Sequence, residues 1–309
     1  MKRFRNILVV APPGADLDAT LRAAENLAVA NKAELTLFDA VPPVNVRARN
    51  PDGHSQEDIR NLVETARLTQ LKELTDTIST VEVEVAVATG TLFLEVIRRT
   101  LAFEHDLVMI SPDQDAGAVG LTRASTVMHL MRKCPVPVWV VRSEPSERGD
   151  VMAAVGPFED GSPTLLDRKI VELASSLASR TGGRFHLLHS WSLQGESLLR
   201  NGRVRLAAAE VDRFVEEAEV SARTALDKLL AETGISSEDV ELHLVKGNAA
   251  DSITQMAAEL APEVVVMGTL ARSGIAGLLI GNSAENVLGS LETSILAVKP
   301  IGFSTPVSL

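Results

Sequence analysis

The chain contains the same pattern of apolar and polar segments twice, and this repeat limits the folds that are open to it. Ser111 and Gly268 each follow a short apolar run, and they are 157 positions apart. The same offset relates Gly90 to Gly247 and also aligns the last apolar run of each copy. Matches at one offset in three separate segments indicate an internal duplication, so we expect two units of one fold.

A polar stretch that contains both proline and glycine, Ser143–Asp150, separates the two copies. We therefore predict a first domain at residues 1–143 and a second domain at residues 150–309. The first apolar runs of the two copies are only 144 positions apart, so the second copy has 13 additional residues. These residues fall in or near Ser192–Val211, ahead of a strongly helical segment.

Within each copy, strand-like runs alternate with segments of helical periodicity. In the first copy we predict strands at Ile7–Ala11, Leu35–Val41, Val81–Ala88, Leu107–Ser111 and Val136–Val141. The helices between them are predicted at Leu17–Ala30, Gln56–Thr75, Leu92–Ala102 and Ala124–Lys133. In the second copy the strands are expected at 151–155, 184–190, 240–246, 263–267 and 294–298. Strands joined by helices form parallel crossovers, so each copy is predicted to be a Rossmann-like α/β domain with a five-stranded parallel sheet and helices on both faces.

Composition limits the partners and the compartment. The formal net charge of −11 argues against direct binding of nucleic acid. No segment approaches the roughly 18 uninterrupted apolar residues that a membrane span requires. The single cysteine, Cys134, excludes an intrachain disulfide and fits a reducing compartment, so we expect a cytoplasmic protein.

The loop after the fourth strand of the second copy has glycines at a spacing suited to phosphate binding. Gly268 begins this loop and Gly281 ends it, directly before a predicted helix. Glycines let the backbone approach phosphate oxygens, and the amides at a helix start attract anions. The candidate ligand-binding residues are Gly268, Ala271, Arg272, Gly281, Asn282 and Ser283.

This loop resembles that of the universal stress protein family, whose nucleotide-binding members carry G-x2-G-x9-G-[S/T] at this place. Gly268 and Gly281 hold the outer glycine positions, Ala271 stands at the middle glycine, and Asn282 stands at the Ser/Thr. The runs Gly-Thr-x-Ala-Arg and Gly-Asn-Ser-Ala-Glu are similar to the tandem, E-type branch of the family. The resemblance covers nearly the whole chain and implies two adenine nucleotide alpha hydrolase-like domains, with ATP or AMP and Mg²⁺ as candidate ligands of the second.

Two departures from the family pattern concern the ligand. Nucleotide-binding members have an Asp at the end of the first strand that contacts the adenosine part, whereas this chain has Pro12 in the first copy and Gly156 in the second. The same loop residues also fit a loop that binds no ligand, because Asn282 and Ser283 are of types common at helix N-caps and Gly281 suits a tight turn.

The first copy has lost every glycine of this motif. The corresponding positions are Ser111, Gln114, Ala124 and Ser125. We therefore expect a phosphate site only in the second copy and a structural role for the first.

The function expected from the resemblance is stress response by binding a small ligand and acting through regulation or interaction. Nothing in the sequence demands catalysis: the nucleophile elbow G-x-S-x-G, the Walker sequence and GxGxxG are all absent. Two alternatives remain, a slow ATPase or self-phosphorylating protein that uses Ser283 or a nearby hydroxyl, and a carrier of an apolar or lipid-like ligand lodged between the copies.

The histidines show no metal-ligand spacing, so no metal site is expected. His186 and His189 are three apart on one predicted strand and face opposite sides of the sheet. For His189 a hydrogen-bonded strand histidine is preferred over a ligand contact. Finally, the last strands, Val136–Val141 and Ser294–Val298, would expose unpaired backbone groups, so we expect the two copies to pair through them within one chain, with assembly of two chains as a further option.

Overall fold

A computed structural model describes most of the chain and divides it into two compact units. The described residues are 4–43, 55–112, 126–142, 144–145, 149–158, 161–201, 206–269, 287 and 289–309. Within them, the first unit comprises residues up to 145 together with 302–309, and the second comprises 149–269 and 287–301. The domain limits 1–143 and 150–309 remain a sequence-based prediction, and each unit is described by itself below.

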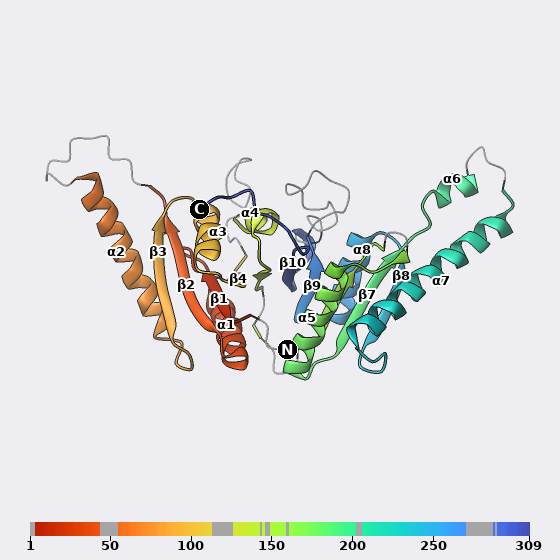
Figure 1. The fold of residues 1–309 in the computed structure, drawn as a ribbon, viewed down its shortest axis with the longest axis horizontal. Coiled ribbons are helices and arrows are strands. Elements are labelled where there is room, and N and C mark those ends of the chain that lie inside the picture. Colours follow the sequence, from red (N-terminus) through yellow and green to blue (C-terminus); the bar gives the residue numbers. More distant parts are fainter. Residues whose placement is uncertain are drawn as a thin grey trace. The chain divides into compact units, whose positions relative to one another are not determined.

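The first unit is an α/β domain with a parallel sheet, as predicted (Figure 1). Its strands are β1 (Asn6–Val10), β2 (Glu34–Val41), β3 (Val83–Thr89), β4 (Leu107–Ile110) and β5 (Val138–Val140). They lie in the order β3-β2-β1-β4-β5, and the neighbours in this order are parallel. The strand order therefore reverses at β1, between β2 and β4.

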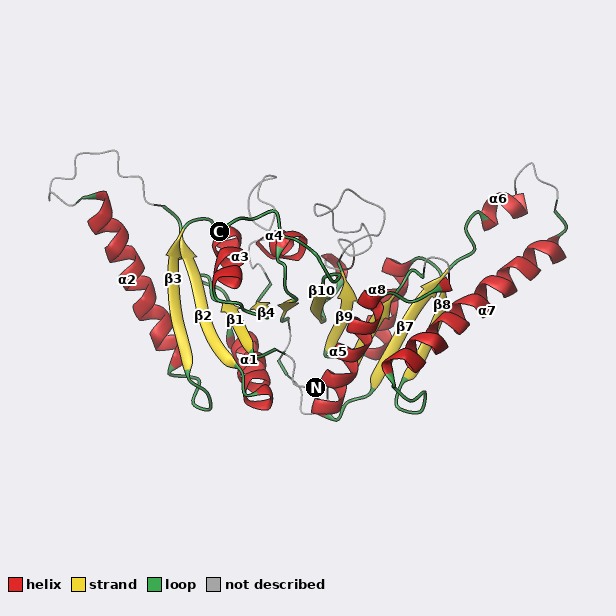
Figure 2. Ribbon diagram, in the orientation of Figure 1, coloured by secondary structure: helices red, strands yellow, loops and turns green. Residues whose placement is uncertain are grey.

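Helices connect these strands in the described part of the first unit (Figure 2). They are α1 (Asp18–Asn31), α2 (Gln56–Thr75), α3 (Leu92–Ala102) and α4 (Thr126–Lys133). Right-handed crossovers place α1 and α2 on one face and α3 and α4 on the other. The contacts agree, because α1 packs on β1 and β2, α2 packs on β2 and β3, and α3 contacts α4.

The second unit repeats this plan. Its strands are β6 (Val151–Val155), β7 (Phe185–Trp191), β8 (Glu241–Lys246), β9 (Val264–Gly268) and β10 (Ser294–Val298). Their order is β10-β9-β6-β7-β8, and the pairing is again parallel. The described helices of this unit are α5 (Leu165–Thr181), α6 (Glu196–Asn201), α7 (Ala208–Thr233) and α8 (Ala249–Leu260).

Of the 13 additional residues of the second copy, seven lie between β7 and β8, in the connection where the sequence places all of them, and six lie between β6 and β7. The short helix α6 stands between β7 and the long helix α7, and it contacts α7. Helix α7 then packs on β7 and against α5 (Figure 1). The additional residues thus lengthen two crossover connections and leave the strand order unchanged.

The central strands form the core of each unit because helices cover both sheet faces. Strand β1 is buried from Ile7 onward, and all of β6 is buried. Cys134 is likewise fully buried. Among the described helices, none combines the length and the apolar character that a membrane crossing needs.

Candidate functional site

The strand order of the second unit reverses beside β6, which lies between β7 and β9. The chain leaves β6 towards β7 and later returns to form β9 on the other side of β6. In open parallel sheets, the crevice at such a reversal, beyond the carboxyl ends of the strands, is the usual ligand site. Here those ends are Gly156 after β6 and Gly268 at the end of β9.

Of the predicted ligand-binding residues, Gly268 lies in the described part of the chain. It is the last residue of β9 and pairs with Val298 of β10. A Cβ atom at Gly268 would come within 3.0 Å of the Leu166 Cδ2 atom on α5, so this glycine also permits close helix packing. The other predicted residues, Ala271, Arg272, Gly281, Asn282 and Ser283, lie outside the described residues.

A buried lysine stands where the loop begins. The Lys299 side chain, directly after β10, is 3% exposed, and its Nζ donates to the Thr269 hydroxyl at 2.8 Å. Thr269 is the first residue after Gly268, and its amide donates to the Val298 carbonyl. Lys299 thus places a basic side chain beside the first residue of the loop.

A carboxylate lies at the end of β6, although the sequence has no Asp there. Asp167 on α5 is 2% exposed and accepts the Gly156 amide at 2.9 Å. Its other oxygen accepts the amide and the hydroxyl of Thr164, which closes a capping box at the start of α5. Asp167 therefore fixes the turn after β6 to the helix that follows it.

His189 fills the space beside this turn. Its Nδ1 donates to the Val155 carbonyl at 3.1 Å, and its ring stacks on Phe158 with the centroids 4.2 Å apart. Burial lowers the pKa of His189, so the ring is neutral at pH 7. The preferred sequence interpretation, a hydrogen-bonded strand histidine, is confirmed by these contacts.

The first unit differs at the equivalent strand ends. Asp39 on β2 occupies the position that His189 holds on β7, and the α2 side chain of Arg67 reaches it. The Arg67 Nε donates to Asp39 at 2.6 Å, while its Nη2 donates to the Ala11 carbonyl, directly after β1. Asp39 is fully buried and Arg67 is 9% exposed. A bound guanidinium thus occupies the strand ends of the first unit.

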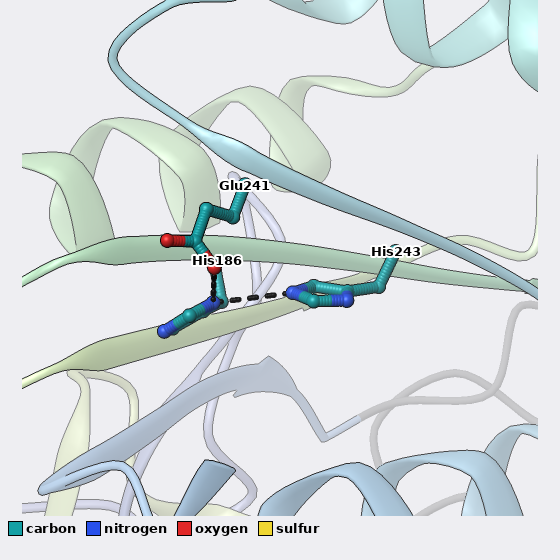
Figure 3. Close-up of side chains that lie close together, drawn as sticks. All are labelled: His186, Glu241 and His243. Atoms are coloured by element: carbon teal, nitrogen blue, oxygen red, sulfur yellow. Dashed lines mark hydrogen bonds and ion pairs between the residues drawn. The ribbon is translucent and has the colours of Figure 1, made fainter.

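A second cluster lies at the opposite, amino-terminal end of the strands of the second unit, and the sequence analysis did not predict it. Figure 3 shows His186 of β7 beside Glu241 and His243 of β8. The two histidines are 57 positions apart, so no short motif contains them. Alternation along β8 puts Glu241 and His243 on one face, but the register with β7 is needed to place His186 there.

Comparison with known proteins gives the same family for both copies. The model of the universal stress protein family matches residues 3–142 and 159–299. Universal stress protein E of Salmonella typhi is 27% identical over 319 aligned residues, which cover 100% of this chain and 98% of that protein. A universal stress protein of Mycolicibacterium smegmatis is 26% identical over 95% of this chain and 97% of its own length.

Solved structures agree in fold over nearly the whole chain. A protein of unknown function from Pseudomonas aeruginosa PAO1 has a TM-score of 0.71 at 25% identity and covers 97% of this chain and 94% of its own. A universal stress protein from Archaeoglobus fulgidus has a TM-score of 0.67 at 14% identity, with 96% and 98% covered. With two family-model matches that span most of its length, this chain belongs to the universal stress protein family, with two copies of the family's domain in tandem.

Proposed function

We propose that this universal stress protein is a cytoplasmic binding protein whose second domain holds an adenine nucleotide, ATP or AMP with Mg²⁺, and which acts by regulation or interaction. The observation that carries the proposal is the cation at the start of the glycine-spaced loop. The Lys299 ammonium lies beside Thr269, one residue beyond Gly268 and next to the strand reversal.

Other contacts of the same strand ends support this assignment. The partly exposed ring of Phe158, stacked on His189, offers an apolar surface beside the turn after β6. In the first unit, Arg67 already binds the carbonyl at the end of β1 and the buried Asp39. We therefore assign the nucleotide to the second domain alone.

Calorimetry of the full chain with Mg-ATP and with Mg-AMP tests the proposal. Gly281→Val is expected to abolish binding because a side chain there blocks backbone approach to phosphate. The matched variant in the first copy, Ala124→Val, leaves the affinity unchanged. Absence of heat at nucleotide concentrations up to about 1 mM, which corresponds to about 4 kcal/mol of binding free energy, contradicts the proposal.

Lys299→Met tests whether Lys299 contacts the phosphates of the nucleotide rather than its adenosine part. Loss of a charge-assisted hydrogen bond worth about 1.5–3 kcal/mol weakens Mg-ATP binding by about 10- to 150-fold. Adenosine, which has no phosphate, should bind the variant and the wild-type chain equally. If the affinities for Mg-ATP and adenosine fall by the same factor, Lys299 acts only by supporting the fold at this edge of the sheet.

Phosphate release from the same samples distinguishes binding from catalysis. A binding protein leaves ATP intact, whereas steady release that Gly281→Val removes favours the slow ATPase. Mass spectrometry of the chain purified under native conditions detects an apolar cargo, the remaining alternative. Pairing of the last strands within one chain and assembly of two chains stay predictions from the sequence.

A further inference from the structure

Three side chains with metal-binding atoms converge on one face of the sheet in the second unit. His186 pairs in register with Glu241, and His243 lies two residues further along β8, so all three point to the same side. The His186 Nδ1 lies 3.1 Å from the His243 Nε2 and 3.2 Å from a carboxylate oxygen of Glu241 (Figure 3). The three ligand atoms lie within 4.8 Å of one another.

These separations suit a tetrahedral ion. Zinc binds imidazole nitrogen and carboxylate oxygen at about 2.0–2.2 Å, so adjacent ligand atoms around it stand about 3.3–3.6 Å apart. The two separations measured from the His186 Nδ1 are slightly shorter than this. The Glu241 and His243 ligand atoms lie up to 4.8 Å from one another, so entry of the ion requires these two side chains to move together by about an ångström.

Without an ion, the two ring nitrogens of His186 cannot make hydrogen bonds to all of the polar groups that face them. Its Nδ1 faces both the Glu241 carboxylate and the His243 ring, and a single ring proton cannot serve both. Its Nε2 is buried without a hydrogen-bond partner, and the nearest Asp150 oxygen is 3.6 Å away. An ion on Nδ1 places the ring proton on Nε2, directed at Asp150.

Asp150 is held in place for that role. The Arg184 side chain donates to Asp150 at 2.6 and 2.9 Å, and the Arg184 amide donates to it at 2.7 Å. A carboxylate that accepts from the second nitrogen of a metal-bound histidine is a common feature of zinc sites, where it fixes the tautomer and the ring orientation.

We propose that His186, Glu241 and His243 bind a zinc-type divalent ion, with Asp150 as the positioning residue for His186 and water completing the coordination. Two imidazoles and one carboxylate are ligands that suit zinc. The Glu241 side chain is 49% exposed, so an ion reaches the cluster from solvent. The site lies at the amino ends of β7 and β8, apart from the proposed nucleotide loop, and its ion would join the edge strand β8 to β7.

The charges around the cluster favour a cation on balance. Asp150, Glu241 and Glu259 of α8 are negative, and Arg184, 3.6 Å from Glu241, is the opposing positive charge.

Titration of the full chain, free of any affinity tag, with Zn²⁺ alone tests the proposal. Calorimetry is expected to give one zinc per chain, and Co²⁺ is expected to show the visible absorption of a tetrahedral site. Glu241→Gln and His243→Gln, which alter the two more exposed ligands, should each lower the affinity at least tenfold. His129→Gln, a matched change of a half-buried histidine in the first unit, should leave it unchanged.

Asp150→Asn tests the positioning role. Loss of such a partner weakens metal binding by about 10- to 100-fold, while the tetrahedral Co²⁺ spectrum is retained. An unaltered affinity overturns the role of Asp150. Absence of zinc binding by the wild-type chain, or binding that neither Glu241→Gln nor His243→Gln reduces, overturns the site itself.

Discussion

The buried ion pair of the first unit can be tested by Arg67→Met, which removes the guanidinium and keeps most of the apolar stem. In the wild-type chain Arg67 donates to Asp39, to the Ala11 carbonyl and to Gln70. Asp39 is fully buried and otherwise accepts the Ala40 amide at 2.8 Å. The variant therefore leaves a charged carboxylate and a backbone carbonyl inside the unit without their main donor.

The expected loss in unfolding free energy is about 3–5 kcal/mol, the cost of removing one partner from a buried ion pair. Arg67→Met/Asp39→Leu also removes the unpaired charge. The double variant should remain below the wild type by about 1–3 kcal/mol, because the Ala11 carbonyl still lacks its donor. The difference between the single and double variants measures the cost of leaving the Asp39 charge alone.

Urea denaturation followed by tryptophan fluorescence measures these values. The chain has two tryptophans and no tyrosine. Trp139 lies buried on β5 and Trp191 on β7, so a Trp191→Phe background reports the first unit separately. Arg22→Met is the matched control, because the Arg22–Glu144 pair is exposed to solvent and should contribute little to stability. A loss for Arg67→Met as small as that of the control would refute the reasoning.

The same variant has a defined pH dependence. Burial raises the pKa of Asp39, and Arg67 acts in the opposite direction, so Arg67→Met raises that pKa further. A carboxyl with a raised folded-state pKa contributes stability below its unfolded-state pKa, about 3.9, and loses it as the pH rises. The stability deficit of Arg67→Met should therefore be smaller at about pH 4 than at about pH 7.

Two further predictions concern single residues. Gly156→Ala should destabilise the second unit by about 1–3 kcal/mol, because Gly156 has φ +93° and a Cβ would come 2.7 Å from the His189 ring. Urea denaturation in a Trp139→Phe background measures this loss, and an unchanged urea midpoint would contradict it. Burial, and then the charge of Arg99, lowers the pKa of His105 to about 4. Because this folded-state pKa lies below the ordinary value of about 6.5, stability is full above pH 6.5 and falls by about 1.4 kcal/mol per pH unit towards pH 4. An NMR titration that finds an unshifted pKa for His105 would disprove this.

The sequence predicted the strands and helices well because their signals are local and repeated. Helices α2 and α3 begin and end at the predicted residues, and the predicted strands match the observed ones to within about two residues at either end. The largest differences at a strand end are two residues, at β3, predicted from Val81 and observed from Val83, and at β5, predicted from Val136 and observed from Val138. Each strand assignment is also supported by the other copy, because every apolar run in one copy has a counterpart in the other.

The sites were less predictable because their residues meet through strand register and helix packing. Asp167 reaches the turn after β6 from α5, and Arg67 reaches Ala11 across 56 positions. Neither contact follows from spacing within a strand. The His186 and His243 pair similarly depends on the register of β7 with β8, which periodicity within one strand does not specify.

The asymmetry of the two copies follows from what binds the carbonyl at the end of the first strand. In the first unit the Ala11 carbonyl accepts from Arg67, whose charge then requires a buried partner, Asp39. In the second unit the Val155 carbonyl accepts from the neutral His189, which needs no counter-charge. Arg142 of the first unit corresponds to Lys299 at the offset of 157 positions, so the difference between the units at these strand ends lies in Arg67 and Asp39. Restoring the motif glycine in the first copy by Ala124→Gly should therefore be insufficient to create nucleotide binding there while Arg67 and Asp39 are present.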